Sequence, residues 1–176
     1  MPIVNSSQYT VRKTSLIRNI SRLIKNEVIP LQDLKSATLT IGFVLDIHLI
    51  RAIEVNKMDF GKPEGIRVLL LNEKKVVSIL DFYCSAKNIR FSNALVGDDV
   101  REFVSILNMM EKKYQPHKEP NELSYLHFFL SPSTYIMVSQ PNGADYFKHN
   151  DKKVLKINKK ILQSELKTFI QTRHPL

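Results

Sequence analysis

The sequence predicts a single α+β domain over residues 1–176, in which a twisted, mainly antiparallel sheet is packed by about three helices. The 176 residues, 43 % of them hydrophobic, are enough for one substantial core and too few to need a second. Apolar residues recur at helical spacing in three separate segments. The segments between them either alternate in polarity or are rich in β-branched residues, as strands are.

The first expected element is a basic amphipathic helix within residues 10–29. Leucine and isoleucine recur there at intervals of three and four, which is the spacing of one helix face. Arg18, Arg22 and Lys25 lie at i, i+4 and i+7 on another face. Pro30 ends the helix, because the residue before a proline is disfavoured in helical geometry.

Three strands are expected next. Residues 39–55 alternate between apolar and polar side chains, which predicts a long half-buried strand with a bulge or bend near Arg51, where the alternation falters. Residues 66–71 and 76–83 are two apolar, β-branched runs separated by four polar residues, which predicts a hairpin. Their nearly continuous apolar character predicts burial on both faces.

A second helix is expected over residues 99–114. Asp99 can cap its start, and Glu102 stands three residues later in the capping-box position. The rest of the chain repeats the order of strands and helix in shorter form. Three strands and a closing helix are predicted over residues 123–130, 135–138, 154–157 and 158–172.

Residues 38–114 and 123–172 therefore share a predicted order of three strands followed by a helix. This βββα order indicates an internal duplication, although any α+β chain can contain such runs and no residue motif aligns between the halves. The order resembles that of the whirly and Pur-type single-strand-binding proteins, which pair repeated β-meanders with a helix. The resemblance is limited to element order and identifies no family.

Positive charge is concentrated at the two ends of the chain, whose formal net charge is +9. Residues 1–26 hold five cations and no acid, and residues 148–176 hold eight cations against two acids. Residues 27–147 hold thirteen cations and fifteen acids and are nearly neutral. Clustered charge builds a local potential that scattered charge does not, which favours a polyanionic partner. We expect the two basic ends to fold together into one continuous positive surface.

The charge pattern favours a non-enzymatic protein that binds nucleic acid, either single-stranded DNA or RNA, or a nucleoprotein. Lysine and arginine at one-turn intervals can neutralise successive phosphates, and nearby aromatic rings can stack on unpaired bases. The expected stacking residues are Tyr146 and Phe147. The expected phosphate contacts are Arg12, Lys13, Arg18, Arg22, Lys25, Lys148, Lys152, Lys153, Lys156, Lys159 and Lys160.

Two alternatives use the same charge. The basic helix could lie on an anionic membrane surface, as in a peripheral protein or a viral matrix or nucleocapsid-associated assembly protein, with self-association into a homo-oligomer. The other alternative is that the cations are an ordinary solvated surface.

Motifs for catalysis, metal and cofactors are missing from the sequence. The five histidines are scattered, the single cysteine is Cys84, and no two of these residues stand at ligand spacing. The five glycines form no phosphate-binding loop, and there is no nucleophile elbow. We expect no cofactor, no metal and no catalysis, with an unrecognised hydrolase or nuclease as the alternative.

The lone cysteine favours a reducing compartment, either cytoplasm or nucleus, or a virion. The longest apolar candidate segment is interrupted by charged residues, so we expect no membrane span. Residues 1–26 are free of acids and rich in Ser and Thr, which also fits a mitochondrial targeting segment.

Overall fold

A computed structural model describes most of the chain and contains nine strands and four helices in those residues. The described residues are 3–4, 6–29, 39–86, 88–114, 121–128, 131, 133–140, 142–150 and 153–173. The helices are α1 (Ser7–Lys25), α2 (Ala52–Lys57), α3 (Asp98–Tyr114) and α4 (Lys159–Arg173). The strands are β1 (Ile3–Val4), β2 (Leu39–Leu49), β3 (Gly65–Asn72), β4 (Lys75–Cys84), β5 (Ile89–Leu95), β6 (Asn121–His127), β7 (Thr134–Gln140), β8 (Gly143–Asn150) and β9 (Lys153–Ile157).

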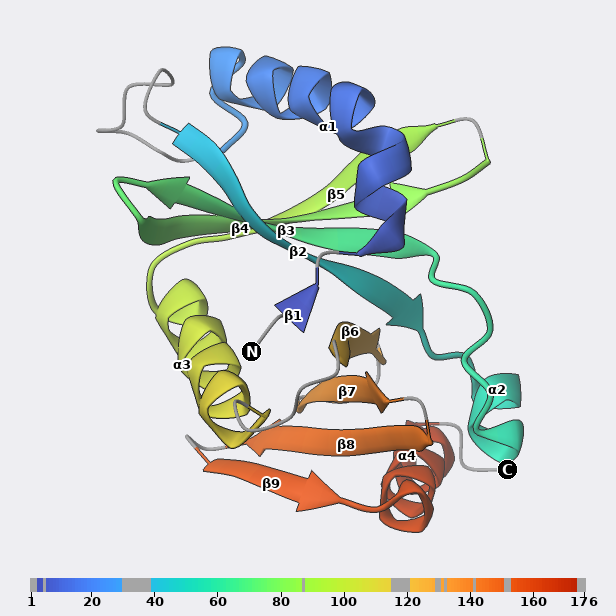
Figure 1. Cartoon of the computed structure of the whole chain (residues 1–176). Helices are drawn as coiled ribbons and strands as arrows, with labels where there is room; N and C mark the ends of the chain where they lie inside the picture. The colour runs from blue at the N-terminus through green and yellow to red at the C-terminus, as the bar shows by residue number, and fades with distance from the viewer. Residues whose placement is uncertain are drawn as a thin grey trace.

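The strands form one mixed sheet built from two four-stranded antiparallel meanders, in the order β5-β4-β3-β2-β6-β7-β8-β9. The two meanders meet where the first strand of each pairs with the other, β2 with β6, in parallel. The paired segment is short: it runs from Asp46, opposite Ser124, to Leu49, opposite His127. The short β1 pairs with β6 beside it, also in parallel. The predicted α+β class and mainly antiparallel sheet are confirmed (Figure 1).

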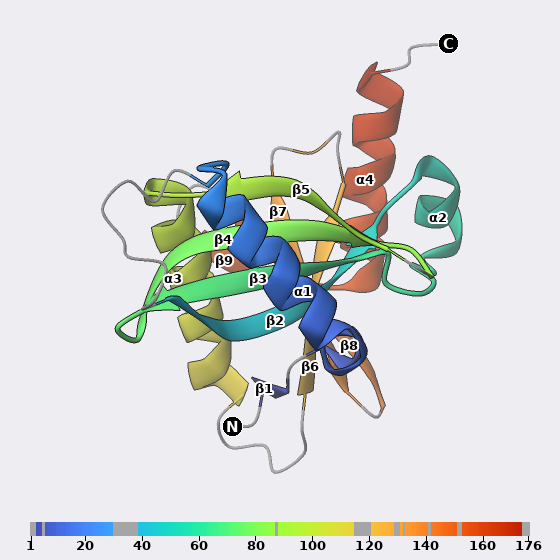
Figure 2. The same ribbon diagram turned by 90° about the horizontal axis from the view of Figure 1, so that it is seen from above.

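Helix α1 covers the outer face of the first meander, as the view from above shows (Figure 2). Leu16, Ile20 and Leu23 are at most 8 % exposed and pack on side chains such as Val68 and Phe82 of that meander. Burying each such side chain stabilises the fold by about 1.5–3 kcal/mol. The apolar stripe of α1 is therefore buried in the core.

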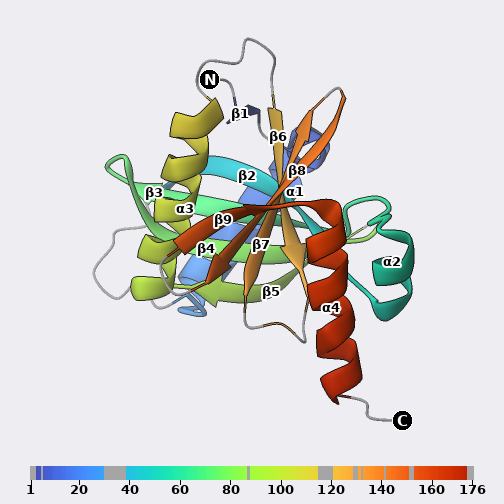
Figure 3. The ribbon, with the colours of Figure 1, turned by 90° about the horizontal axis from the view of Figure 1, so that it is seen from below.

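Helix α3 lies between the two meanders and packs on both. Its Phe103 and Ile106 share one core cluster with Leu45 of β2, Leu123 of β6 and Phe147 of β8. Because alternate strand residues point to opposite faces, the other face of the second meander needs its own cover. Helix α4 supplies it, and Figure 3 shows α4 lying along that meander, where its inward side chains share a second cluster with β6, β7, β8 and β9.

A hydrogen bond from Ser6 holds the start of α1 against β2. The Ser6 hydroxyl accepts a hydrogen bond from the backbone amide of Gln8 at 3.1 Å, which caps the helix. The same hydroxyl donates a hydrogen bond to the buried Asp46 carboxylate of β2. Burial raises the pKa of Asp46, with the Ser6 hydrogen bond acting in the opposite direction. The helix consequently begins at Ser7, earlier than the predicted residue 10.

Besides the two-residue strand β1, three elements differ from the sequence prediction. Two of them are strands, so each half contains four strands before its helix, where three were predicted. Strand β5 went unpredicted because Ser92 is an extra residue: Phe82 pairs with Phe91 and Asp81 with Asn93, so the alternation changes phase. Strand β8 went unpredicted because both of its faces are covered, so neighbouring residues are buried together.

The third difference is α2, which replaces the expected bend and continuation of the first strand. The Glu54 carboxylate accepts from the Arg51 amide at 2.7 Å and so caps a helix of six residues. Met58 then ends it in a left-handed conformation, with a φ of 49°. Spacing alone did not reveal this helix, because Ile53 and Val55 also fit strand alternation.

A buried arginine links its own strand to three other elements at the centre of the molecule. Arg67 of β3 donates to both carboxylate oxygens of Asp81 in β4, each at 2.8 Å. Its guanidinium carbon lies 3.6 Å from the ring centre of Tyr125 in β6 and 4.7 Å from that of Phe103 in α3. Burial alone would lower the pKa of Arg67, but the hydrogen bonds and charge of Asp81 outweigh it and raise that pKa.

Replacing Arg67 with alanine should lower the free energy of unfolding by about 3–5 kcal/mol, because the Asp81 carboxylate is then buried without its partner. The double variant Arg67→Met, Asp81→Leu should recover most of that loss, because it removes both charges at similar volume. Urea unfolding followed by circular dichroism measures both effects. A single variant within about 1 kcal/mol of the wild type would contradict the assigned role.

Candidate functional site

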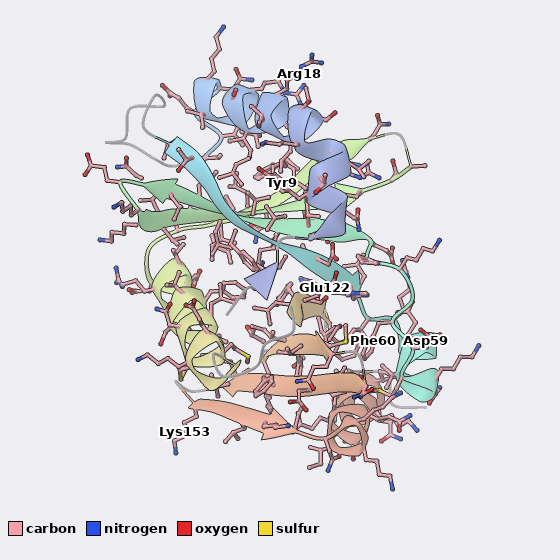
Figure 4. The ribbon with its side chains drawn as sticks, in the orientation of Figure 1. Tyr9, Arg18, Asp59, Phe60, Glu122 and Lys153 are labelled. Carbon is pink, nitrogen blue, oxygen red and sulfur yellow. The ribbon has the colours of Figure 1, made fainter. Side chains whose placement is uncertain are left out.

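The exposed part of α1 is a cationic surface, to which Arg18, Arg22 and Lys25 contribute from one face and Lys13 from the side of Tyr9. Lys13, Arg18, Arg22 and Lys25 are all exposed, and the helix contains no acid. Arg18 points away from the body of the molecule (Figure 4). Among the described residues, no carboxylate forms an ion pair with these four side chains. Arg12 differs: it is half-buried and donates to the Ser85 carbonyl at 2.7 Å.

A groove of about 790 Å³ runs between α1 and the beginning of β2. Its lining is mostly aliphatic, with Lys13 and Lys25 on the helix side and Tyr9 as its aromatic residue. Tyr9 is half-buried and lies on the side of α1 that faces the sheet (Figure 4). The remaining lining residues are Ile17, Ile20, Ser21, Ile24, Leu39, Thr40, Ile41 and Leu70.

Sequence reasoning missed Tyr9 because the helix was expected to begin after it. The available signal was Ser6, a preferred capping residue, which extends the helix by one turn and brings Tyr9 onto the same face as Leu16 and Ile20. The groove could not be predicted at all, since it depends on where α1 crosses β2.

A second group of cations lies on β9 and α4. Lys153, Lys159 and Lys160 are exposed, as expected for ligand contacts. Two other predicted contacts are paired within the chain: the Lys148 ammonium lies 3.0 Å from the Glu165 carboxylate, and that of Lys156 lies 2.7 Å from Asp145. Lys152 lies outside the described residues.

The two predicted stacking residues are part of the core. Tyr146 is 8 % exposed and Phe147 is 3 % exposed, and they belong to the clusters on opposite faces of β8. A base needs an open ring face to stack on, so this burial counts against the stacking role expected for both residues, of which Tyr146 also lines a groove at the start of β8. Adjacent residues of a strand point to opposite faces, so the sequence indicated that one of the two rings would face solvent. In β8 both faces are covered, and both rings are buried.

The two basic ends do not converge. Figure 4 places Arg18 of α1 and Lys153 of β9 at opposite ends of the molecule, with both meanders between them. Each meander starts at the central pair of strands and grows away from it, so α1 on the first meander and β9 at the edge of the second are held apart. The expectation of one continuous positive surface is therefore wrong, and with it the argument for a polyanionic partner that relied on the combined charge of both ends.

A smaller polar pocket of about 300 Å³ lies between the meanders and α3. Arg67 and Asp81 line it but satisfy each other, and His127 lies beside Tyr125 with ring centres 5.6 Å apart. At its rim the Glu102 carboxylate also lies 2.8 Å from the ring of His149. Burial lowers the pKa of His127 below its ordinary value of 6.5, so the ring is neutral at pH 7. We assign this pocket to the packing of α3 against both meanders.

Among the described residues, His, Cys, Asp and Glu form no group of three or more that could hold a metal ion. In the same part of the chain, no helix is both long and apolar enough to cross a bilayer. No protein-family model matches the sequence, and neither a curated protein nor a solved structure shows significant similarity to it.

The free energy of unfolding should fall as the pH drops through about 6.5, because His127 gains its proton in the unfolded chain before it does in the folded protein. The stability from this group is present above the unfolded pKa and is lost as the pH falls toward the lower folded pKa. His127→Gln should show a smaller loss of urea midpoint between about pH 7.5 and 5.5. Equal losses in the wild type and the variant would contradict the lowered pKa of His127. As a control, the urea midpoints of the two proteins should change equally between about pH 8 and 7.5.

Proposed function

We propose that this protein binds nucleic acid without catalysis, and that α1 with its adjoining groove is the principal contact surface. One observation carries the proposal: four exposed cations stand on an acid-free helix and form no ion pair with a described carboxylate. Cations that are already paired within a protein gain little from a phosphate, whereas unpaired ones release counterions when they meet a polyanion.

The dimensions of α1 suit several phosphates of one strand. Lys13 and Lys25 are twelve residues apart, which is about 18 Å along a helix at 1.5 Å per residue. In stacked, duplex-like geometry the phosphates of one strand are spaced by about 3.4 Å of axial rise, so the helix spans about five of them, and fewer of an extended single strand. Arg18 and Arg22 lie between the two lysines on the outward face.

The groove favours single strands over duplexes. Its aliphatic lining and Tyr9 offer a surface for unstacked bases, while Lys13 and Lys25 stand where the attached phosphates would pass. In a duplex the bases are paired inside and cannot enter, so only the backbone contacts remain. Single-stranded DNA or RNA is therefore the proposed ligand.

The packing of α1 counts against the membrane alternative. An interfacial helix binds by burying its apolar face among acyl chains, but Leu16, Ile20 and Leu23 of α1 are already buried against the first meander. Val11, which is 85 % exposed, and Ile17 are the apolar side chains left on the outside of α1. Two aliphatic side chains give a weak anchor compared with a full stripe.

The quadruple variant Lys13→Gln, Arg18→Gln, Arg22→Gln, Lys25→Gln should bind a labelled single-stranded oligonucleotide more weakly, with a flatter salt dependence. Four lost phosphate contacts predict a slope of log affinity against log salt that is shallower by up to about 3. Fluorescence anisotropy between about 50 and 200 mM salt measures the slope.

The matched control removes four exposed lysines elsewhere: Lys57→Gln, Lys62→Gln, Lys75→Gln, Lys112→Gln. It lowers the net charge equally but should keep the wild-type slope within about 1 unit. Absence of wild-type binding at about 50 mM salt, or an equal loss in the control, would contradict the proposal. Flotation with anionic vesicles that depends on α1, without oligonucleotide binding, would favour the membrane alternative instead.

A further inference from the structure

The β9–α4 end carries cations beyond those that its own acids neutralise. Lys148 and Lys156 are paired with Glu165 and Asp145, which are the acids of the described residues between 143 and 173. Four of the remaining cations are exposed, and two of these, seven residues apart, share the outer face of α4. We call these four residues the β9–α4 surface: Lys153, Lys159, Lys160 and Lys167.

A groove of about 740 Å³ adjoins this surface, where α4 and β8 begin and β9 ends. It is lined by Lys156 and Lys159, by the exposed Ile161, and by the short side chains at the beginning of β8. Asp145 also lines it, with its carboxylate held by Lys156 at 2.7 Å. Like the groove beside α1, it combines apolar lining with flanking lysines.

The β9–α4 surface and the α1 surface act independently. Four strand-to-strand steps separate β9 from β2, which is about 19 Å at 4.8 Å per step, and α1 lies beyond them on the first meander. Exposed charges are screened over about 8 Å at physiological salt, so neither surface strengthens the potential at the other.

Acidic side chains lie between the two surfaces. The middle of the chain is nearly neutral and holds fifteen of the seventeen acids. Asp59 and Glu122 are among them, and Figure 4 shows both between the two ends of the molecule. Phosphates are repelled by such exposed carboxylates, so each surface is suited to its own segment.

We infer that the β9–α4 surface is a second nucleic-acid-binding surface, and that one molecule bridges two separate segments. This inference rests on the proposed function of α1, because bridging needs both surfaces to bind. The ligand class at the second surface is the same polyanionic backbone, recognised by charge complementarity with unpaired lysines. Bridging would bring two strands, or two distant parts of one strand, to opposite ends of the protein.

A capture assay tests the bridge. One single-stranded oligonucleotide is immobilised on beads, a second, fluorescent one stays in solution, and full-length protein is added at low salt. Wild-type protein should retain the fluorescent strand on the beads. The variant Lys153→Gln, Lys159→Gln, Lys160→Gln, Lys167→Gln should lose at least about tenfold in capture, while it still binds the free oligonucleotide through α1.

The quadruple α1 variant should also lose capture, and the control with Lys57, Lys62, Lys75 and Lys112 changed to Gln should keep it. Wild-type capture by the β9–α4 variant would overturn the inference, because two α1 surfaces of a self-associated protein would then suffice. Oligonucleotide binding by the wild type without any capture would also overturn it and leave the proposed function intact. Absence of wild-type binding would instead remove the proposed function itself.

Discussion

The parallel pairing of β2 with β6 is the constraint on which the rest of the structure depends. It covers only Asp46–Leu49 opposite Ser124–His127, yet it joins two meanders that otherwise pack together through α3 and through α2, which lies against α4. Because β2 and β6 are the first strands of their meanders, each meander extends outward from this pair. Arg67 strengthens the same place by joining β3 and β4 to α3 and β6 through one buried guanidinium.

The pairing of β2 with β6 determines where the cationic side chains lie. A helix with one apolar stripe must lay it on a sheet, so α1 covers the first meander and turns Arg18, Arg22 and Lys25 to solvent. The last strand and helix of the chain belong to the far side of the second meander, and their lysines are exposed there. The proposed nucleic-acid binding therefore involves two separated cationic surfaces, each beside its own groove.

Local pattern predicted the elements that alternate regularly or are continuously apolar, and it failed where the sequence does neither. The helical spacing around Leu16 is in the sequence because one face of α1 is buried, and the apolar run of β3 is there because both of its faces are. The alternation that begins at Leu39 predicted β2, although its polar Asp46 and His48 are buried as well. Strand β8 has both faces covered and β5 contains a bulge, so neither keeps a period. The exposed cations of the site were predictable from charge alone. Their separation was not, since it depends on a long-range pairing of strands.

The most direct test of two separated cationic surfaces is a lysine footprint of the complex. Full-length protein with saturating single-stranded oligonucleotide is briefly acetylated, and the modification of each lysine is measured by mass spectrometry. Protection should be concentrated at Lys13 and Lys25 and, as a second group, at Lys159 and Lys160, with central lysines such as Lys112 modified as in the free protein. Uniform protection, or protection confined to the central lysines, would contradict the account.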